Sequence, residues 1–267
     1  MILCFVLFIL FILCLLFLII YVSAAFLKAQ YLTGKRPVAV LLNERKSAPD
    51  YCPWEEISEE VKKYFILIED PGFYQRNGVK LKNIVRRGIS HYIEKDRVVH
   101  GSTISQQLAK NLYFRFEKSI FRKISEFFIC QEIERCLTKE EIFTFYLNII
   151  YYGNNIYGIS DASAFYFSKK AAKLTANQAI FFACLIAGPN AGNPVHYPDK
   201  FFRLKRRKLE KCFQESLISE EEFRYFCSFP EDLPDPEFAP SIKRTEKAPV
   251  ILMVNERFGP VHRHETV

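Results

Sequence analysis

An acidic pair follows an apolar stretch in the first third of the chain. Glu69 and Asp70 come directly after Val61–Ile68 and stand before Pro71-Gly72. A carboxylate at the end of an apolar segment is partly withdrawn from water and can accept a proton from a hydroxyl group. Many such pairs are simply solvated helix ends. Glu69 therefore becomes a candidate catalytic base only if other residues support it.

A second group of polar residues follows Gly101 and combines hydroxyls, amides and a lysine. Its members are Ser102, Thr103, Gln106, Gln107 and Lys110. Exposed backbone N–H groups at the start of a helix, with a lysine on the same helix, can hold an anionic group such as a pyrophosphate. The alternative is a Ser or Thr cap that begins an ordinary helix.

A third group places two cations and an acid within about one helical turn, so that they share one face. Arg122 and Lys123 precede Glu126, and Lys118 lies shortly before them. A plain salt bridge is one interpretation. The other is a site that binds phosphates directly, or through a divalent ion held by Glu126. Further along, Asn148 is a candidate for a polar group that faces a cleft.

Taken in this order, the segments resemble the glycosyltransferase family of peptidoglycan synthesis, which comprises the monofunctional transglycosylases and the transglycosylase domains of class A penicillin-binding proteins. The similarity runs from about Ser58 to Lys211. The residues that match the motifs of the family are Glu69, Asp70, Phe73 and Gly78, then Gly101 to Gln107, then Arg122, Lys123 and Glu126, then Tyr146 to Asn148, Gly153, Gly158, Tyr166-Phe167, Leu174-Thr175 and Ala187-Gly188-Pro189.

The sequence departs from the pattern of the family at three positions. Arg76 replaces a His, His100 replaces a Gly that often precedes Gly101, and Gln178 replaces a Glu. The chain has no Ser-x-x-Lys and no Lys-Thr-Gly, which are the motifs of the penicillin-binding transpeptidases. The resemblance is therefore to the monofunctional form.

The resemblance implies an all-α, lysozyme-like fold that polymerises lipid II with inversion at the anomeric carbon. Glu69 would remove the proton from the 4-hydroxyl of the acceptor, undecaprenyl pyrophosphate would leave, and Glu126 would be the second acid. By the same similarity, Lys110, Lys118, Arg122 and Lys123 would neutralise the pyrophosphate with Mg²⁺ at Glu126, and the substrate would contact Ser102, Thr103, Gln106, Gln107 and Asn148. The expected partners are lipid II, the growing glycan strand, the membrane and transpeptidases of the cell-wall machinery, with no nucleic acid.

The first part of the chain predicts a membrane anchor. Residues 1–27 carry no charge, and Ile2 to Tyr21 are almost wholly apolar. As a helix this segment would extend about 40 Å at about 1.5 Å per residue, which suffices to cross a hydrocarbon core of about 30 Å. A cleaved signal peptide is the alternative, and Ser23-Ala24-Ala25 would suit it, but the apolar run is longer than usual and lacks a basic start.

Charge and family give opposite orientations for this anchor. The first basic residues, Lys28, Lys35 and Arg36, follow the span, and the positive-inside rule then favours a cytoplasmic domain. The resemblance implies the reverse, a single-pass protein of the cytoplasmic (inner) membrane with its catalytic domain on the periplasmic, extracytoplasmic face. We give the function that the resemblance implies more weight than the charge pattern, and we therefore predict that the catalytic domain lies on the extracytoplasmic side.

The remaining residues predict one domain between a linker and a tail. We expect an anchor at 1–27, a linker at 28–57 with a short strand at 38–42, a glycosyltransferase domain at 58–229 and a disordered tail at 230–267. Within the domain, Ser58 would begin a helix that Gly72 ends, and residues 79–93 form a basic amphipathic segment that suits a membrane surface or a core. Further helices are predicted at 102–117, 120–137, 139–150, 156–171 and 175–187.

Composition leaves several classes open. The net charge of +7 over 267 residues suits a phosphate-bearing partner, an anionic membrane or nucleic acid, and the eight cysteines lack metal-site spacing and favour free thiols over disulfides. Two alternative functions also remain: a lysozyme-like hydrolase of glycan strands, and an inactive membrane-bound scaffold for cell-wall enzymes. The cations at Lys110, Arg122 and Lys123 argue against hydrolysis, which needs no pyrophosphate site.

Overall fold

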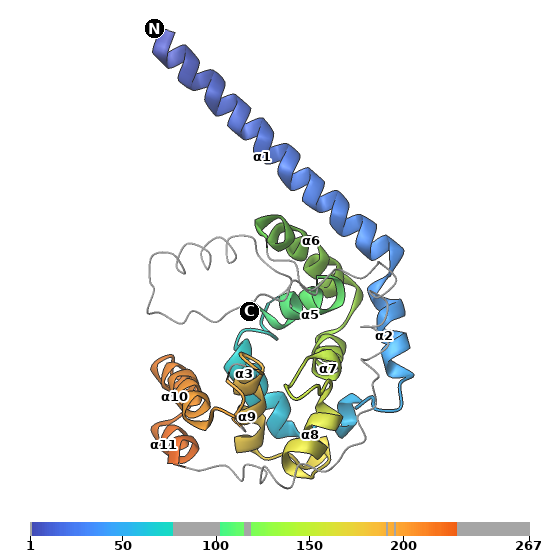
Figure 1. Cartoon of the computed structure of the whole chain (residues 1–267), viewed down its shortest axis with the longest axis vertical. Coiled ribbons are helices and arrows are strands. Elements are labelled where there is room, and N and C mark those ends of the chain that lie inside the picture. The colour runs from blue at the N-terminus through green and yellow to red at the C-terminus, as the bar shows by residue number, and fades with distance from the viewer. Residues whose placement is uncertain (1, 77–101, 115–118, 191, 195, 229–267) are drawn as a thin grey trace, which may run out of the picture. The chain divides into compact units, whose positions relative to one another are not determined.

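The described part of the chain is all-α. The computed structural model describes residues 2–76, 102–114, 119–190, 192–194 and 196–228, and within these ranges it contains helices and no strand (Figure 1). This confirms the predicted all-α class. The amphipathic segment 79–93, the tail 230–267 and the single residues Gly78, His100, Gly101 and Lys118 lie outside the described residues.

The chain folds into two compact units. The first comprises residues 1–40 and 74–142, and the second comprises residues 41–73 and 143–267. Glu69 belongs to the second unit, whereas the polar groups around Ser102 and Glu126 belong to the first. The two candidate regions are therefore described separately.

The N-terminal helix is longer than the predicted anchor. Helix α1 spans Ile2–Lys35, and its apolar part is long enough to cross a membrane. After Pro37 the chain forms helix α2, Val38–Lys46, where a short strand was expected, so that prediction was wrong. The reason is the spacing of the buried residues: Val38, Leu41 and Leu42 recur at helical intervals and not in alternation.

The first unit packs α6, Ile120–Cys136, on α1 and α5, Ile104–Tyr113, on α6. Helix α7, Lys139–Ile149, begins in this unit and ends in the second. These three helices confirm the predicted segments 102–117, 120–137 and 139–150 within a few residues at their ends.

The second unit is built around a buried helix. Residues 177–185 of α9, Ala176–Leu185, are all buried, and α9 packs on the helical turns before Glu69 and on α10, Pro198–Gln214. Helix α8, Ile159–Phe167, the short 3₁₀ turns Trp54–Glu56 and Ala171–Lys173, and α11, Glu220–Ser228, complete it. Sequence reasoning predicted α8 and α9 but did not identify α10 or α11.

A short helical segment with an unusual turn leads to Glu69. A π-helical turn, η2, spans Val61–Phe65 and continues into α3, Ile66–Glu69. Ser58 caps the start as predicted, because its Oγ accepts a hydrogen bond from the backbone N–H of Val61 at 3.2 Å. The end was attributed to Gly72, but the helix already stops at Asp70, whose φ and ψ are −156° and 69°. The proline at 71 explains this, because its ring disfavours helical geometry in the preceding residue.

Candidate active site

Glu69 is held by a lysine that lies far away in the sequence. The Nζ of Lys208, on α10, lies 2.6 Å from Oε1 of Glu69 and also donates a hydrogen bond to the carbonyl of Ala183 at 2.9 Å. Only 12% of the Glu69 side chain and 15% of the Lys208 side chain are exposed. The carboxylate proposed as a base therefore has a fixed cationic neighbour, and we call the two residues the Glu69–Lys208 pair.

The surroundings of this pair keep Lys208 charged. Desolvation by burial is the largest single influence on Lys208 and would lower its pKa, but the charge and hydrogen bond of Glu69, together with Cys184 and Cys212, outweigh it, so the pKa of the lysine is raised. Tyr146 lies near the same carboxylate. Burial, and then the charge of Glu69, raise the pKa of the Tyr146 phenol well above its usual value. This side of the site thus holds an ammonium ion and a neutral phenol beside the acid.

The third sequence group forms a compact cluster on α6. Glu126 is 1% exposed, and its Oε2 accepts a hydrogen bond from Nζ of Lys123 at 2.8 Å. Nη1 of Arg122 lies 3.0 Å from Oε1 of Glu126. Lys123 also donates a hydrogen bond to Oγ of Ser102, at 3.3 Å, which joins the start of α5 to the same place. We call Ser102, Arg122, Lys123 and Glu126 the α6 cluster.

Two buried polar atoms of the α6 cluster accept or donate no hydrogen bond in the described structure. These atoms are Oε1 of Glu126 and Nε of Arg122. Oε1 is close enough to Arg122 for an ion pair, but the geometry does not satisfy a hydrogen bond, so the attraction there is mainly coulombic. Buried polar atoms without partners are rare and commonly mark a place for water, an ion or a ligand. The cluster is therefore equipped to receive a polar group.

The α5 residues divide between a structural cap and the cluster. Thr103 and Gln106 form a capping box: Oγ1 of Thr103 accepts from the Gln106 N–H at 3.2 Å, and Oε1 of Gln106 accepts from the Thr103 N–H at 2.9 Å. Both side chains are buried. The alternative considered for this segment, a Ser or Thr cap that begins a helix, is therefore present in the structure. It uses two of the side chains that were predicted to bind substrate. Nε2 of Gln107 donates to the carbonyl of Ser102 at 3.2 Å, and Lys110 is exposed further along α5.

Asn148 was a candidate for a polar group that faces a cleft, but in the structure it does not face one. It is completely buried, its Nδ2 donates to the carbonyls of Cys52 and Thr144, both at 2.8 Å, and its Oδ1 accepts from the Cys52 N–H at 2.8 Å. Both ends of the amide are used within the protein. Asn148 therefore fastens the segment around Cys52 to α7, and its assignment to the substrate is corrected.

The two described departures from the family motifs have different surroundings. Oε1 of Gln178 accepts a hydrogen bond from the Thr175 N–H at 3.1 Å in a second capping box, an interaction that both Glu and Gln can make. The replacement at Gln178 thus keeps a structural interaction. Arg76 instead lines a hollow of about 420 Å³ beside the C-terminal end of α6, together with Glu134 and Lys139. In this hollow Glu134 accepts hydrogen bonds from Ser105 and Lys139.

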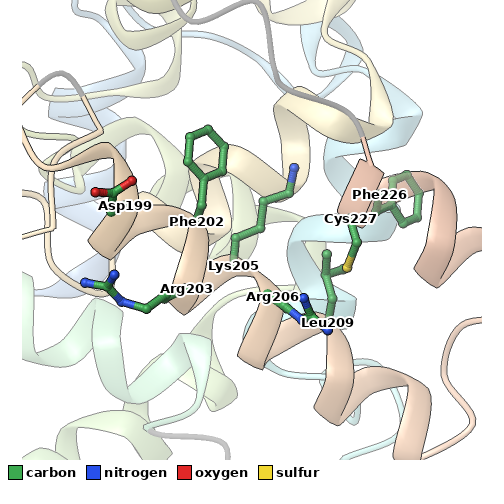
Figure 2. A pocket seen from close by; sticks show the side chains of 8 residues that line it. All are labelled: Asp199, Phe202, Arg203, Lys205, Arg206, Leu209, Phe226 and Cys227. Carbon is green, nitrogen blue, oxygen red and sulfur yellow. The ribbon is translucent and has the colours of Figure 1, made fainter.

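A further hollow lies between α10 and α11, away from the residues that sequence reasoning selected. It measures about 350 Å³, and its charged lining residues are Asp199, Arg203, Lys205 and Arg206. Figure 2 shows that the charged ends of these side chains point in different directions, so they do not converge on one ligand. Nε of Arg206 lies 2.9 Å from Oε1 of Glu210. We therefore assign this hollow no function.

Comparison with known proteins gives a family assignment. A sequence profile of the family "Transglycosylase" matches residues 35–212. The chain is 31% identical over 212 residues to a monofunctional glycosyltransferase of Staphylococcus haemolyticus, which covers 77% of this chain and 78% of that protein. It is 36% identical over 145 residues to penicillin-binding protein 1F of Bacillus subtilis, 54% of this chain and 20% of that protein.

The relation to the penicillin-binding proteins covers a smaller part of each of them. Penicillin-binding protein 1A of Aquifex aeolicus is 35% identical over 173 residues, which is 65% of this chain and 24% of that protein. The chain thus spans only about a fifth to a quarter of these longer relatives. The profile nevertheless covers more than half of this chain, and the monofunctional relative is matched over most of its length. The chain belongs to the transglycosylase family.

Proposed function

We propose that the protein polymerises the glycan strands of peptidoglycan from lipid II, with undecaprenyl pyrophosphate as the leaving group. The α6 cluster is the observation that carries this proposal. Two cations are fixed on a buried carboxylate, and Nε of Arg122 and Oε1 of Glu126 have no hydrogen-bond partner among the described residues. A departing pyrophosphate needs fixed positive charge, whereas hydrolysis of a glycan strand does not.

In this reaction Glu69 acts as the base. Its carboxylate takes the proton of the acceptor 4-hydroxyl, and the oxygen attacks the anomeric carbon of the donor sugar with inversion. The bond between that carbon and the pyrophosphate oxygen breaks, and its electron pair leaves with the pyrophosphate. Lys208 holds the carboxylate of Glu69 in place, because its Nζ is itself fixed by the carbonyl of Ala183. A base held in one orientation reaches the hydroxyl proton more often.

The α6 cluster neutralises the charge that develops on the leaving group. Arg122 and Lys123 supply the fixed cations, with Lys110 and Lys118 as additional positive charges, and Glu126 holds the two cations of its own helix in position. Ser102 and Gln107 are the α5 residues that we propose to contact the sugar or phosphate.

Mg²⁺ fits the α6 cluster only together with the substrate. The described residues contain no group of three His, Cys, Asp or Glu side chains that could hold a metal. Mg²⁺ commonly uses one or two carboxylates and completes its shell with water and substrate phosphates. Oε1 of Glu126, which accepts no hydrogen bond from the part of the chain that the structure describes, is the protein atom that would hold it. When bound, the ion would offset phosphate charge.

We further propose that α1 anchors the enzyme in the cytoplasmic membrane, with the rest of the chain on the extracytoplasmic face, where it works with transpeptidases. Lipid-linked disaccharides are polymerised there, which is the reason to prefer this side over the one that Lys28, Lys35 and Arg36 favour. A reporter that is active only outside the cytoplasm, fused after Val267, tests the orientation. Activity of a cytoplasmic reporter at the same position would contradict it.

The decisive experiment supplies the purified protein with labelled lipid II in proteoliposomes. We expect glycan polymer from the parent protein and none from the Glu69→Gln variant. The same protein should not shorten preformed glycan strands, and shortening would identify a hydrolase instead. No polymer from either protein, under conditions in which a relative makes polymer, would favour the scaffold.

A further inference from the structure

Helix α10 carries a row of exposed cations on one side. Lys200, Arg203 and Arg207 follow one another at intervals of three and four residues, so they share one face of the helix, and all three are exposed. Within the described part of the chain none of the three forms an ion pair. We call these residues the α10 stripe. It is separate from Lys208, which is largely buried against Glu69.

The α10 stripe does not suit a compact anion. Its three residues extend over about 10 Å of the helix axis, at about 1.5 Å per residue. Figure 2 shows that Arg203 is directed away from Arg206, which lies beside the stripe and is already paired with Glu210. Cations that are spaced along a helix match a partner whose acids are spaced as well, and such a partner is an acidic peptide segment.

Helices α10 and α11 form an antiparallel pair. The ring of Phe223, near the start of α11, stacks on Phe213, near the end of α10, with centroids 5.4 Å apart. Cys227, near the end of α11, lines the same hollow as Arg203 and Arg206, which lie in the first half of α10 (Figure 2). The chain therefore leaves α11 close to the α10 stripe.

The sequence that follows α11 is acidic. Residues 229–238 lie outside the described residues, and they contain three prolines, no Lys or Arg, and the acids Glu231, Asp232, Asp235 and Glu237. We call them the acidic segment. An extended chain covers at most about 3.3–3.6 Å per residue, so ten residues reach about 30 Å, well beyond the length of the stripe. The prolines reduce the conformational freedom that binding would remove.

We propose that the acidic segment docks on the α10 stripe of the same chain through ion pairs between its carboxylates and the three cations. The complementary charges and the direct connection from α11 carry this proposal. Exposed ion pairs are individually weak. A short tether, however, gives an effective concentration of about a millimolar, so that several weak pairs together can hold the segment. Docking needs neither substrate nor catalysis, and it is therefore independent of the proposed function.

Crosslinking of carboxylates to amines tests the docking in the full-length protein. A carbodiimide joins a carboxylate to a lysine amine only when the two groups are in contact, and Lys200 supplies the amine of the stripe. In proteoliposomes of neutral lipid, we expect mass spectrometry to find peptides that join Lys200 to the acidic segment. Their yield should fall from about 0.1 M to about 1 M salt, because the Debye length shrinks from about 10 Å to about 3 Å. The absence of these peptides at the lower salt concentration would overturn the proposal.

Reversal of charge on the stripe has a matched control. The double variant Arg203→Glu with Arg207→Glu reverses two cations and leaves Lys200 in place. The control, Lys170→Glu with Lys173→Glu, makes the same change of charge at exposed positions elsewhere in the second unit. We expect the first variant to lower the crosslinking yield about threefold or more, and the control to change it little. Equal yields in the two variants would overturn the proposal.

A compensating change distinguishes lost docking from misfolding. Asp232→Arg with Asp235→Arg, added to the variant with the reversed stripe, restores opposite charges while Glu231 and Glu237 remain available for crosslinking. We expect most of the parent yield to return. A misfolded α10 would not be rescued by changes outside it, so a yield that stays low while the melting temperature matches that of the parent would contradict the docking.

Two further measurements identify the partner of the stripe. When protein labelled with heavy isotopes is mixed with unlabelled protein, both crosslinked peptides should carry the same label. Crosslinks between heavy and light peptides would mean that the stripe binds the acidic segment of a second copy. Loss of the crosslink when neutral lipid is replaced by anionic lipid would mean that the stripe binds the membrane surface. Either result would overturn docking within one chain.

Discussion

The two acidic centres of the molecule contain similar groups, but one acid has its cationic partners close by in the sequence and the other has its partner far away. Glu126 meets cations three and four residues earlier on its own helix, whereas Glu69 meets a lysine that lies 139 residues later. Both acids are largely buried, with 1% and 12% of the side chain exposed, and each has an ammonium nitrogen within 3 Å. The α6 cluster is local, and the Glu69–Lys208 pair depends on the tertiary fold.

This difference predicts different behaviour on perturbation. A cluster within one helix survives as long as the helix survives, because its spacing is fixed by the helical turn. A pair between α3 and α10 requires that α9 hold both helices, since α9 packs on each of them. Changes at the pair should therefore report on the fold and the chemistry together, whereas changes at the cluster should report mainly on anion binding.

The largest expected effect is the loss of the base. Glu69→Gln keeps the size of the side chain but cannot take a proton, and positioned general bases contribute about 10²- to 10⁴-fold to rates. We expect kcat for lipid II polymerisation to fall by about that factor, with a smaller change in KM. Glu59→Gln is the control, because Glu59 lies nearby but is 85% exposed. A loss below about tenfold at Glu69 would remove its assignment as the base.

The second effect tests the Glu69–Lys208 pair, whose two residues are far apart in the sequence. Lys208→Met leaves the carboxylate of Glu69 with little exposure and without its cation, and breaking such a pair from one side costs about 3 kcal/mol or more of unfolding free energy. The double variant Glu69→Gln with Lys208→Met removes both charges and should recover much of this loss. Denaturant unfolding of the four proteins measures the coupling. Additive losses would mean that the pair does not interact.

Local patterns in the sequence predicted much of the fold and the local half of the site. Helices α5 to α9 follow apolar spacing, and the α6 cluster follows from three charged residues within one turn. The membership in the family, predicted from ordered motifs, is confirmed by the profile and the relatives. The strand at 38–42 was wrong because an apolar run alone does not distinguish a strand from a buried helical face.

The remaining parts depend on contacts that no local pattern reports. Lys208 is one of several cations on α10, and nothing in its immediate sequence distinguishes it from Lys205 or Lys211. Its role becomes visible only when α9 and α10 are packed beside α3. Asn148 was placed in a cleft for the same reason, because its buried partner Cys52 lies 96 residues away. The roles assigned to the site residues remain predictions.

The third effect therefore concerns Asn148 and separates stability from catalysis. Asn148→Ala leaves the buried backbone groups of Cys52 and Thr144 without their partner, at a cost of about 1–3 kcal/mol. We expect a lower melting temperature but an unchanged kcat per folded molecule at low temperature. A fall in kcat larger than about tenfold, with unchanged stability, would restore the original assignment to the substrate.

The fourth effect compares the two cations of the α6 cluster. Arg122 is 11% exposed and Lys123 is 44% exposed, so water screens the lysine more. We expect Arg122→Ala to lower kcat/KM for lipid II by about tenfold or more, and Lys123→Ala by less, because a desolvated charge acts more strongly on a phosphate. Arg135→Ala is the control, since Arg135 pairs with Glu132 on the same helix but is 72% exposed. Equal losses of kcat/KM in all three variants would mean that the α6 cluster does not bind the pyrophosphate of lipid II.

The smallest expected effect is a pH dependence that belongs to the non-local pair alone. Burial would lower the pKa of Lys208, yet Glu69, with smaller contributions from Cys184 and Cys212, raises it above the ordinary value of 10.5. A pKa raised by folding contributes stability that is fully present below the ordinary value and is lost as the pH rises through the value in the folded protein. The difference in unfolding free energy between the parent and Lys208→Met should thus stay constant from neutral pH to about pH 10 and shrink above 10.5. Taking the difference cancels the titration of groups common to both proteins. A difference that already shrinks below pH 10 would mean that desolvation outweighs Glu69, and the pair would then be weaker than its geometry implies.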